Sequence, residues 1–493
     1  MDLASYRASA RQFQTELTLE KYQHHAGIKE ELAIEPIYRK YGELFTDSAV
    51  KELFELHRHA QADGEKPLRH LLHFTCEHSL NAEVFAEDQE LARVQSTADL
   101  DVGGQKLSFH EAAVHLSNEL DPARRARLFD ARMEVIARSN PLRVQRMNKL
   151  HSKARVLFSM PYTELYQHLT RVNFPVLKTQ LENFLGASES YYSTHLERYA
   201  RDTLGLELGQ VRAADVPLLM RGHRYDHLFP QDRILSLLKR TLMGLGVDLK
   251  KQTNIVIDSA ERASKSSIPH CFPVQVPQEV YLVFRPQGSA FDFLTLFHEA
   301  AHALHHGFTS ENEPFEFHVL GDPAVGETYG FLFEYLTLNE DWLQDFLKLP
   351  QGDTDLLEFT QFRKLYLLRR YAARFLFELV LHSRDDVGDP SLPDEYAQQQ
   401  QKALLLPAEP AVFLHDLEET FYGTRFLRGW IFEAELREIL IARFGSRWYS
   451  RPAAGDFLRE LWSFGFRYDC DELAARIRRW GLNVDPITRE LQK

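Results

Sequence analysis

A short run in the second half of the chain carries the residue types of a metal-dependent hydrolase. The five residues from His298 read H-E-A-A-H, and no Gly or Pro follows before Gly307. On a helix, residues four apart lie on one face, so His298 and His302 can present two imidazoles to one ion while Glu299 lies beside them to take a proton. Helical zinc hydrolases hold Zn²⁺ and activate a water molecule in this way.

A catalytic zinc site needs a third protein ligand besides the two imidazoles. His305 shares their face, but seven residues of helix separate it from His298 by roughly 10 Å, too far for both to bind one ion. Glu327 fits better, because it lies in the first turn of a second helical pattern that starts after Pro323. Glu334, two turns further along, could orient a ligand imidazole. The other candidates that follow the motif are His306, Glu311, Glu313, Glu316 and His318.

The composition is that of a large globular protein. The chain has 493 residues, of which 44% are hydrophobic and 26% charged, so it can bury a large core. Its net charge of −13 argues against nucleic acid or an anionic membrane as the main partner. Three cysteines far apart form no disulfide framework, and no apolar run reaches about 18 residues. These features predict a cytoplasmic protein that does not span a membrane.

Capping residues and long runs without Gly or Pro predict a mostly α fold. An Asp-Pro pair at 121–122 begins a helix that runs to Arg138, and Ser108 with Glu111 forms a capping box. The segment 353–384 carries apolar residues at helical spacing and predicts one long, largely buried helix. We expect a helical N-terminal lobe over 1–210 and a catalytic domain over 211–493.

Strands are expected in two places. Leu91–Gln95 and Gln105–Leu107 flank a Gly-Gly pair and predict a small hairpin within the N-terminal lobe. Val274–Val276 and Val280–Phe284 are β-rich runs just ahead of the metal motif, and they predict a small β-sheet beside the zinc helix. An extended peptide could add to an exposed edge of these strands, unless they are simply buried.

The metal motif and the position of Glu327, 29 residues after His298, resemble the thimet oligopeptidase and oligoendopeptidase F family of zinc peptidases. That family has the same helix pattern, including the histidine at the position of His305, and a glutamate ligand on a following helix. A second block, from Phe413 to Trp430, is similar to the family's block of a histidine followed by aromatic residues and glycines. The family block supplies hydrogen-bond donors to the substrate.

The resemblance implies a fold, an activity and a set of roles. The fold would be a helical two-lobed shell around a deep channel, with a small β-sheet beside the zinc helix. The activity would be hydrolysis of peptide bonds in short unstructured peptides. The implied site comprises zinc held by His298, His302 and Glu327, Glu299 as the general base, and His415 and Tyr422 as substrate-binding donors that stabilise the charge on the carbonyl oxygen.

The chain departs from the family pattern in the two blocks that carry the resemblance. Ala301 stands where the family usually has glycine before the second histidine. Phe426 and Trp430 stand where oligoendopeptidase-type relatives have further tyrosines, which leaves Tyr422 as the main candidate phenol. The chain is also shorter than most relatives.

Three functions remain open from the sequence. The first is a zinc endopeptidase acting on short peptides. The second is a zinc carboxypeptidase, which needs a cation for the terminal carboxylate of its substrate; Arg425 and Arg428 lie next to Tyr422. The third is a helical binding protein with a structural or vestigial metal site, for which Cys271 is the only nearby cysteine. The oligomeric state and the replacement of Zn²⁺ by Co²⁺ or Mn²⁺ are left open.

Overall fold

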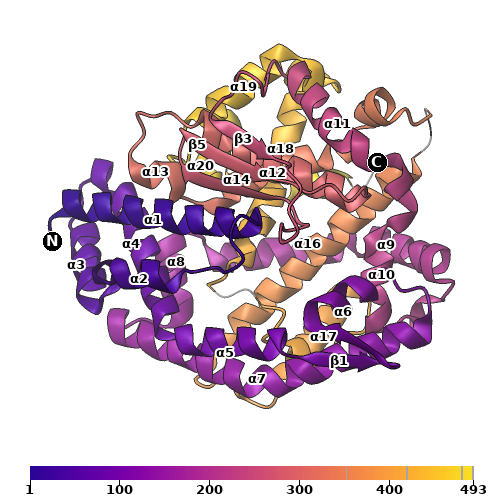
Figure 1. Cartoon of the computed structure of the whole chain (residues 1–493), viewed down its shortest axis with the longest axis horizontal. Helices are drawn as coiled ribbons and strands as arrows, with labels where there is room; N and C mark the ends of the chain where they lie inside the picture. The colour runs from indigo at the N-terminus through magenta and orange to yellow at the C-terminus, as the bar shows by residue number, and fades with distance from the viewer. Residues whose placement is uncertain (351, 353, 418–419, 479–480, 491–493) are drawn as a thin grey trace. The chain divides into compact units, whose positions relative to one another are not determined.

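The computed structural model describes residues 1–350, 352, 354–417, 420–478 and 481–490 (Figure 1). Helices hold 70% of the residues and strands 5%, which confirms the predicted mostly α fold with a small β-sheet. None of the helices formed by the described residues combines the length and apolar character needed to cross a membrane.

The chain folds into two compact units that are discontinuous in sequence. Unit 1 comprises 1–76, 224–360 and 425–490, and unit 2 comprises 77–223 and 361–424, with 491–493 outside the described residues. These units do not coincide with the expected ranges 1–210 and 211–493. The physical reason lies in the first helix, which buries its apolar face against the small sheet near the metal motif and so joins unit 1.

Unit 1 is built from helices around a three-stranded sheet. Its N-terminal helices are α1 (Leu3–His25), α2 (Glu35–Lys40), α3 (Asp47–Arg58) and the first part of α4 (Ala62–Glu83). Its middle segment holds α11 (Gln231–Gly244), the three strands, α12 (Ala290–Phe308), α13 (Phe315–Val319), α14 (Pro323–Glu334), α15 (Glu340–Trp342) and the start of α16 (Asp355–Leu381). Its last segment holds most of α18 (Gly423–Phe444), α19 (Pro452–Ser463), α20 (Cys470–Arg478) and α21 (Asp485–Glu490).

The sheet of unit 1 lies directly before α12 in sequence and has the order β3-β5-β4. Its strands are β3 (Ile255–Asp258), β4 (His270–Gln275) and β5 (Glu279–Val283). β5 pairs parallel with β3 and antiparallel with β4. The predicted run Val280–Phe284 lies largely in the central strand β5, whose two edges are both occupied. Among the described residues, the outer edges of this sheet belong to β3 and β4.

One face of this sheet packs against α1. Tyr22 and Ala26 at the end of α1 form an apolar cluster with Phe272 and Val274 of β4 and Val283 of β5. The same strands contact α12. The sheet therefore connects the N-terminal helix to the helix that carries the motif.

Unit 2 is mostly helical. Its helices are the rest of α4, α5 (Phe85–Ser96), α6 (Phe109–Leu116), α7 (Pro122–Phe158), α8 (Tyr162–Thr170), α9 (Phe174–Leu204), α10 (Val216–Arg221), most of α16 and α17 (Leu392–Leu404). The capping box of Ser108 and Glu111 is present at α6. Asp121 caps α7, which continues through Pro141 well beyond the expected end at Arg138. The expected long helix over 353–384 is α16; Asp353 itself lies outside the described residues.

The hairpin of unit 2 lies closer to its glycine pair than expected. It consists of β1 (Asp99–Val102) and β2 (Gln105–Ser108), paired antiparallel with Val102 opposite Gln105. The expected first strand, Leu91–Gln95, was wrong: these residues belong to α5. Leu100 and Val102 alternate with exposed residues and bury their side chains, which is the two-residue period of a half-buried strand.

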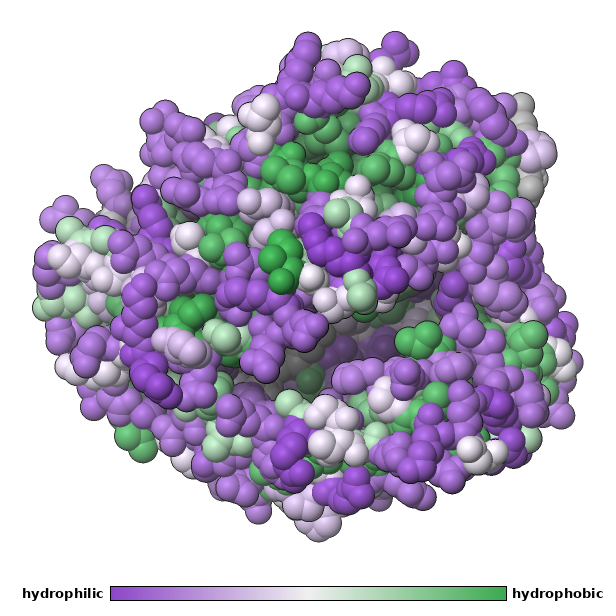
Figure 2. All heavy atoms as spheres, in the orientation of Figure 1, coloured by the Kyte–Doolittle hydropathy of each residue, from purple (hydrophilic) through white to green (hydrophobic). Residues whose placement is uncertain are grey.

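Most of the face viewed in Figure 2 is hydrophilic, as the charged composition leads one to expect. A group of hydrophobic residues lies around the place that β3 occupies in Figure 1. β3 is an edge strand, and its Val256 is 42% exposed.

Candidate metal centre

α12 carries the H-E-x-x-H motif. A cap holds its first turn, and its apolar face is buried. The hydroxyl of Ser289 accepts the N–H of Asp292 (3.0 Å), which caps the helix. Leu296, Phe297 and Leu304 are buried, so the apolar face of α12 is anchored in unit 1. The side chains of His298 and His302 are partly exposed and lie on the remaining face.

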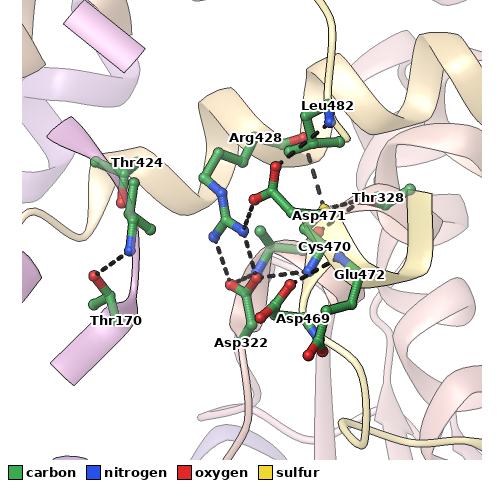
Figure 3. A network of polar contacts seen from close by, with 12 residues as sticks. Thr170, Asp322, Thr328, Thr424, Arg428, Asp469, Cys470, Asp471, Glu472 and Leu482 are labelled. Atoms are coloured by element: carbon green, nitrogen blue, oxygen red, sulfur yellow. Dashed lines mark hydrogen bonds and ion pairs between the residues drawn. The ribbon is translucent and has the colours of Figure 1, made fainter. Parts of the chain in front are cut away.

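α14 packs directly against α12 and is held at its first turn by a polar network (Figure 3). Asp322 caps α14 by accepting the N–H of Ala324 (3.1 Å). The same carboxylate accepts hydrogen bonds from Arg428 of α18 (3.0 Å) and from the N–H of Cys470 in α20 (2.9 Å), and Arg428 also binds Asp471 (3.0 Å). The network ties α18 and α20 to the turn that precedes Glu327.

Two glycines one turn apart on α14 allow the close approach of the two helices. A Cβ at Gly330 would lie 2.6 Å from Nε2 of His298, and a Cβ at Gly326 would lie 3.3 Å from Nδ1 of His302. The first distance is shorter than real side-chain contacts. The imidazoles therefore occupy space that any larger residue at Gly330 would take.

Glu327 reaches the two imidazoles from α14. Its Oε2 lies 3.2 Å from Nε2 of His298 and 4.0 Å from Nε2 of His302. Glu327 is buried, and Oε2 accepts no hydrogen bond of good geometry from any described residue. The two ring centroids are 4.8 Å apart. Oε2 of Glu327 and the Nε2 atoms of both histidines are atoms of the kinds that bind zinc, and the oxygen lies near both rings.

The remaining polar atoms of these ligand candidates are held by other side chains. Nδ1 of His298 donates to Oε2 of Glu334 (3.0 Å), which leaves Nε2 available to an ion. On the other side, Nε of Arg425 lies 3.3 Å from Oε1 of Glu327. Arg425, expected to bind substrate, instead pairs with a ligand candidate and directs its Oε2 towards the imidazoles.

Glu299 lies beside the same centre but is held differently. His298, Glu299 and His302 are the one group of three or more potential ligands whose atoms all lie within 4.8 Å of one another, among the residues described. Oε2 of Glu299, however, accepts the N–H of Cys271 in β4 (2.8 Å). Since Oε2 of Glu327 lacks such a bond, Glu327 is the better candidate for a third ligand, and Glu299 is a neighbouring carboxylate.

Burial and charge shift the pKa values of these groups in opposite directions. Burial alone would raise the pKa of Glu327, but Arg425 and the two imidazoles outweigh it and lower that pKa to about 2. Burial also works to lower the pKa of His298, yet the neighbouring carboxylates of Glu327 and Glu334 raise that pKa to about 10. Burial and the neighbouring His298 lower the pKa of His302 to about 3.

Glu299 shows the opposite shift to Glu327. Burial raises the pKa of Glu299 above its usual range, and His298 offsets only part of the effect. The two carboxyl groups therefore differ in pKa: Glu327 stays ionised, and Glu299 takes up a proton more readily. Separation of this kind between neighbouring carboxylates is typical of catalytic sites.

The other candidate residues lie elsewhere. His305 is fully buried, and its Nε2 faces the carbonyl of Gly465 at 3.2 Å. Nδ1 of His415 lies 3.1 Å from Nη2 of Arg143. His415 and Tyr422 belong to unit 2, whereas the motif, Glu327, Glu334 and Arg425 belong to unit 1.

The sequence reasoning missed three features of the centre. These are the pairing of Arg425 with Glu327, the N–H of Cys271 on Glu299, and the space left by Gly326 and Gly330. Only the last had a visible signal, because two glycines four residues apart place a small stripe on one helix face.

The residues present fit a zinc ion. Two imidazole nitrogens and a buried carboxylate oxygen are donors of the types found in catalytic zinc sites. No protein-family model matches the chain, and no curated protein matches it.

Proposed function

We propose that this protein is a zinc-dependent endopeptidase that hydrolyses short unstructured peptides. The observation that carries the proposal is the buried Oε2 of Glu327, which lies 3.2 Å from Nε2 of His298 and has no hydrogen bond from the described residues. An ionised carboxylate and two imidazoles are donor types of a catalytic zinc site, and a cation bound between them would join all three side chains. The resemblance to the oligopeptidase family supports the same conclusion.

When bound by His298, His302 and Glu327, Zn²⁺ would lower the pKa of a water molecule and polarise the peptide carbonyl. Glu299 would take the proton of the attacking water on Oε1 and then deliver it to the leaving amine. The N–H of Cys271 keeps the other oxygen of Glu299 in place during both transfers. Glu334 holds His298 in the orientation and tautomer that the site needs.

Charge develops on the carbonyl oxygen during attack and needs hydrogen-bond donors. The resemblance assigns this role to His415 and Tyr422. Burial lowers the pKa of His415 to about 4, with Arg143 and Arg132 adding to the effect, so its imidazole is neutral at pH 7 and can donate one hydrogen bond. Tyr422 is 38% exposed and thus accessible to a ligand.

The substrate chain is proposed to bind along β4. β4 is an edge strand, and the N–H of Cys271 within it contacts the general base. An extended peptide that pairs with this edge would therefore pass beside Glu299. Since main-chain bonds depend little on side chains, broad sequence specificity is expected. The cytoplasm is the proposed compartment, because no disulfide joins the three cysteines.

A carboxypeptidase needs a cation to bind the terminal carboxylate of its substrate, and neither of the two candidate arginines fits this role. Arg428 is bound to Asp322 and Asp471, and Arg425 faces Glu327. Neither guanidinium is placed as an open receptor for a terminal carboxylate. A structural zinc site is also disfavoured, since Cys271 offers its backbone N–H to Glu299 and is not among the clustered potential ligands of the described residues.

An internally quenched peptide blocked at both ends tests the proposal. We expect cleavage that a chelator abolishes and added Zn²⁺ restores. Glu299→Gln should lower turnover by at least about a hundredfold while zinc content stays at one per chain. No cleavage of blocked peptides, with trimming of free ones, would establish the carboxypeptidase. Equal activity in Glu299→Gln would exclude this site.

A further inference from the structure

A small polar pocket lies at the end of β4 within unit 1. Its volume is about 150 Å³. It is lined by Pro273–Val276 and Gln278, by Arg11, Gln14 and Thr15 of α1, and by Glu311, Glu313, Phe315, His318 and Val319 around α13. All of these residues belong to unit 1. The chemistry of the metal centre uses none of them.

The lining places the pocket on the outer edge of β4. Successive residues of a strand point to opposite faces, so a pocket that touches four in a row lies at an edge or an end. β5 occupies one edge of β4. The other edge carries the N–H of Cys271, which is turned away from β5 and bonds to Glu299. From Cys271 to Gln275 the strand spans about 14 Å, or four residues of an extended chain.

The outer edge of β4 offers mainly carbonyl oxygens, which accept hydrogen bonds, to an added peptide chain. The N–H of Cys271 is already bonded to Glu299, and Pro273 has no N–H. Antiparallel pairing is the more stable of the two arrangements. A peptide that pairs antiparallel with β4 runs from the Gln275 end to the Cys271 end, so its amino terminus would lie at the pocket.

The pocket carries the carboxylate of Glu311, which acts electrostatically on His318 in the same lining. Glu311 is exposed and forms no ion pair within the described part of the chain. The neighbouring Glu313 is buried and fully engaged by Arg467, at 2.7 Å. Arg11 lies over the ring of Phe315, 5.5 Å from its centroid, where its guanidinium can donate to a carbonyl oxygen. Glu311 is thus the available anion and Arg11 the available donor.

We propose that this pocket binds the amino-terminal residue of the peptide, with the α-ammonium group on Glu311 and the first carbonyl oxygen on Arg11. The proposal rests on the proposed peptidase function. The cleaved bond would then lie about four residues from the amino terminus of the peptide. A free amino terminus becomes part of what the enzyme recognises, and the small volume limits extension of the chain beyond it.

A nine-residue flexible peptide and its N-acetylated twin test the proposal with the zinc-loaded full chain. We expect kcat/KM to be about tenfold higher for the free peptide, as a charge-assisted hydrogen bond allows, with the main cleavage about four residues from the amino end. In Glu311→Gln the ratio of free to acetylated should fall below about twofold. Glu30→Gln, at an exposed glutamate without an ion pair, should keep the tenfold ratio.

Binding separates failure of the subsite from failure of the peptidase. Fluorescence anisotropy with labelled forms of both peptides is measured on Glu299→Gln and on the double variant that adds Glu311→Gln. If neither peptide is cleaved but the binding preference for the free amino terminus depends on Glu311, the peptidase function fails and the subsite stands. If cleavage is zinc-dependent and acetylation has the same effect with and without Glu311, the subsite is excluded. If the pocket instead prefers acidic peptides, and Arg11→Gln removes that preference, the subsite for an amino terminus is also overturned.

Discussion

At the residue scale, the centre is defined by how each carboxylate uses its two oxygens. Glu327 turns one oxygen to Arg425 and the other to the imidazoles. Glu299 turns one oxygen to the N–H of Cys271 and leaves the other for a proton. Glu334 binds the far side of the His298 ring. Each of these carboxylates thus has one oxygen with a defined partner beside the two imidazoles.

Removal of the carboxylate behind His298 should weaken the metal site. We expect Glu334→Gln to reduce the affinity for Zn²⁺ by about 10- to 100-fold, because the bond to Nδ1 orients the ring and raises its basicity. Competition with a chromophoric chelator measures the affinity. Glu340→Gln, an exposed glutamate six residues later, is the matched control and should bind zinc normally. Unchanged affinity in Glu334→Gln would show that Glu334 does not support the site.

The pKa of Glu299 predicts the acid limb of the activity. A general base must be ionised, and burial raises the pKa of this carboxyl above its usual value near 4.5. Activity should therefore be present above the raised pKa and be lost as the pH falls through it. The measurement is kcat/KM against pH, with zinc content checked at each point. A profile that stays flat to below about pH 4.5 would contradict this assignment.

At the element scale, the site depends on the contact between α12 and α14. The sequence predicted both helices and the ligand candidates they carry, because helical periodicity and caps are local signals. It did not predict that Gly326 and Gly330 accommodate the imidazoles, although their spacing was visible. Strands were harder: β3 was missed and Leu91–Gln95 was assigned to a strand, because short apolar runs depend on partners distant in sequence.

A methyl group at Gly330 should disrupt the centre. Its Cβ would lie 2.6 Å from the ring of His298, so we expect Gly330→Ala to lose zinc binding and about 1–3 kcal/mol of stability. Zinc content and urea unfolding check both effects. Gly186→Ala is the control, because this exposed glycine of α9 has open space around it and alanine should stabilise the helix by up to about 1 kcal/mol. Normal zinc binding in Gly330→Ala would contradict the close packing.

At the scale of the whole molecule, the sequence predicted the mostly α fold class, while the two compact units have other boundaries than the expected ranges 1–210 and 211–493. Composition and periodicity are averages over the chain, so they predicted a mostly α protein. A linear division at residue 210 could not anticipate that 1–76 pack with the metal helix, since that depends on α1 meeting a sheet more than 200 residues later. Contacts so distant in sequence leave no local signal.

Glu435 and Glu438 on α18 should make the stability of the protein depend on pH in opposite directions. Burial raises the pKa of Glu435 to about 7, so the folded state keeps a proton that the unfolded chain loses, and the free energy of unfolding should fall between pH 4.5 and 7. Glu435→Gln should remove this loss, on the order of 1 kcal/mol after solvent screening. Denaturant unfolding across this range measures it.

Glu438 provides the comparison on the same helix. Burial works to raise its pKa, but Arg478 and Arg489 outweigh burial and lower it. Its contribution to stability is present above the unfolded pKa and is lost as the pH falls through the lowered value. Glu438→Gln should therefore destabilise the protein at pH 7, where Glu435→Gln stabilises it. The same sign for both variants at pH 7 would contradict these environments.

The central claim is that His298, His302 and Glu327 bind one zinc ion, and anomalous diffraction at the zinc edge tests it most directly. Crystals of the zinc-loaded protein should give one strong peak about 2.0–2.2 Å from Nε2 of both histidines and Oε2 of Glu327, with a further position open. A peak elsewhere, or a peak at the histidines with the carboxylate of Glu327 turned away, would contradict the account.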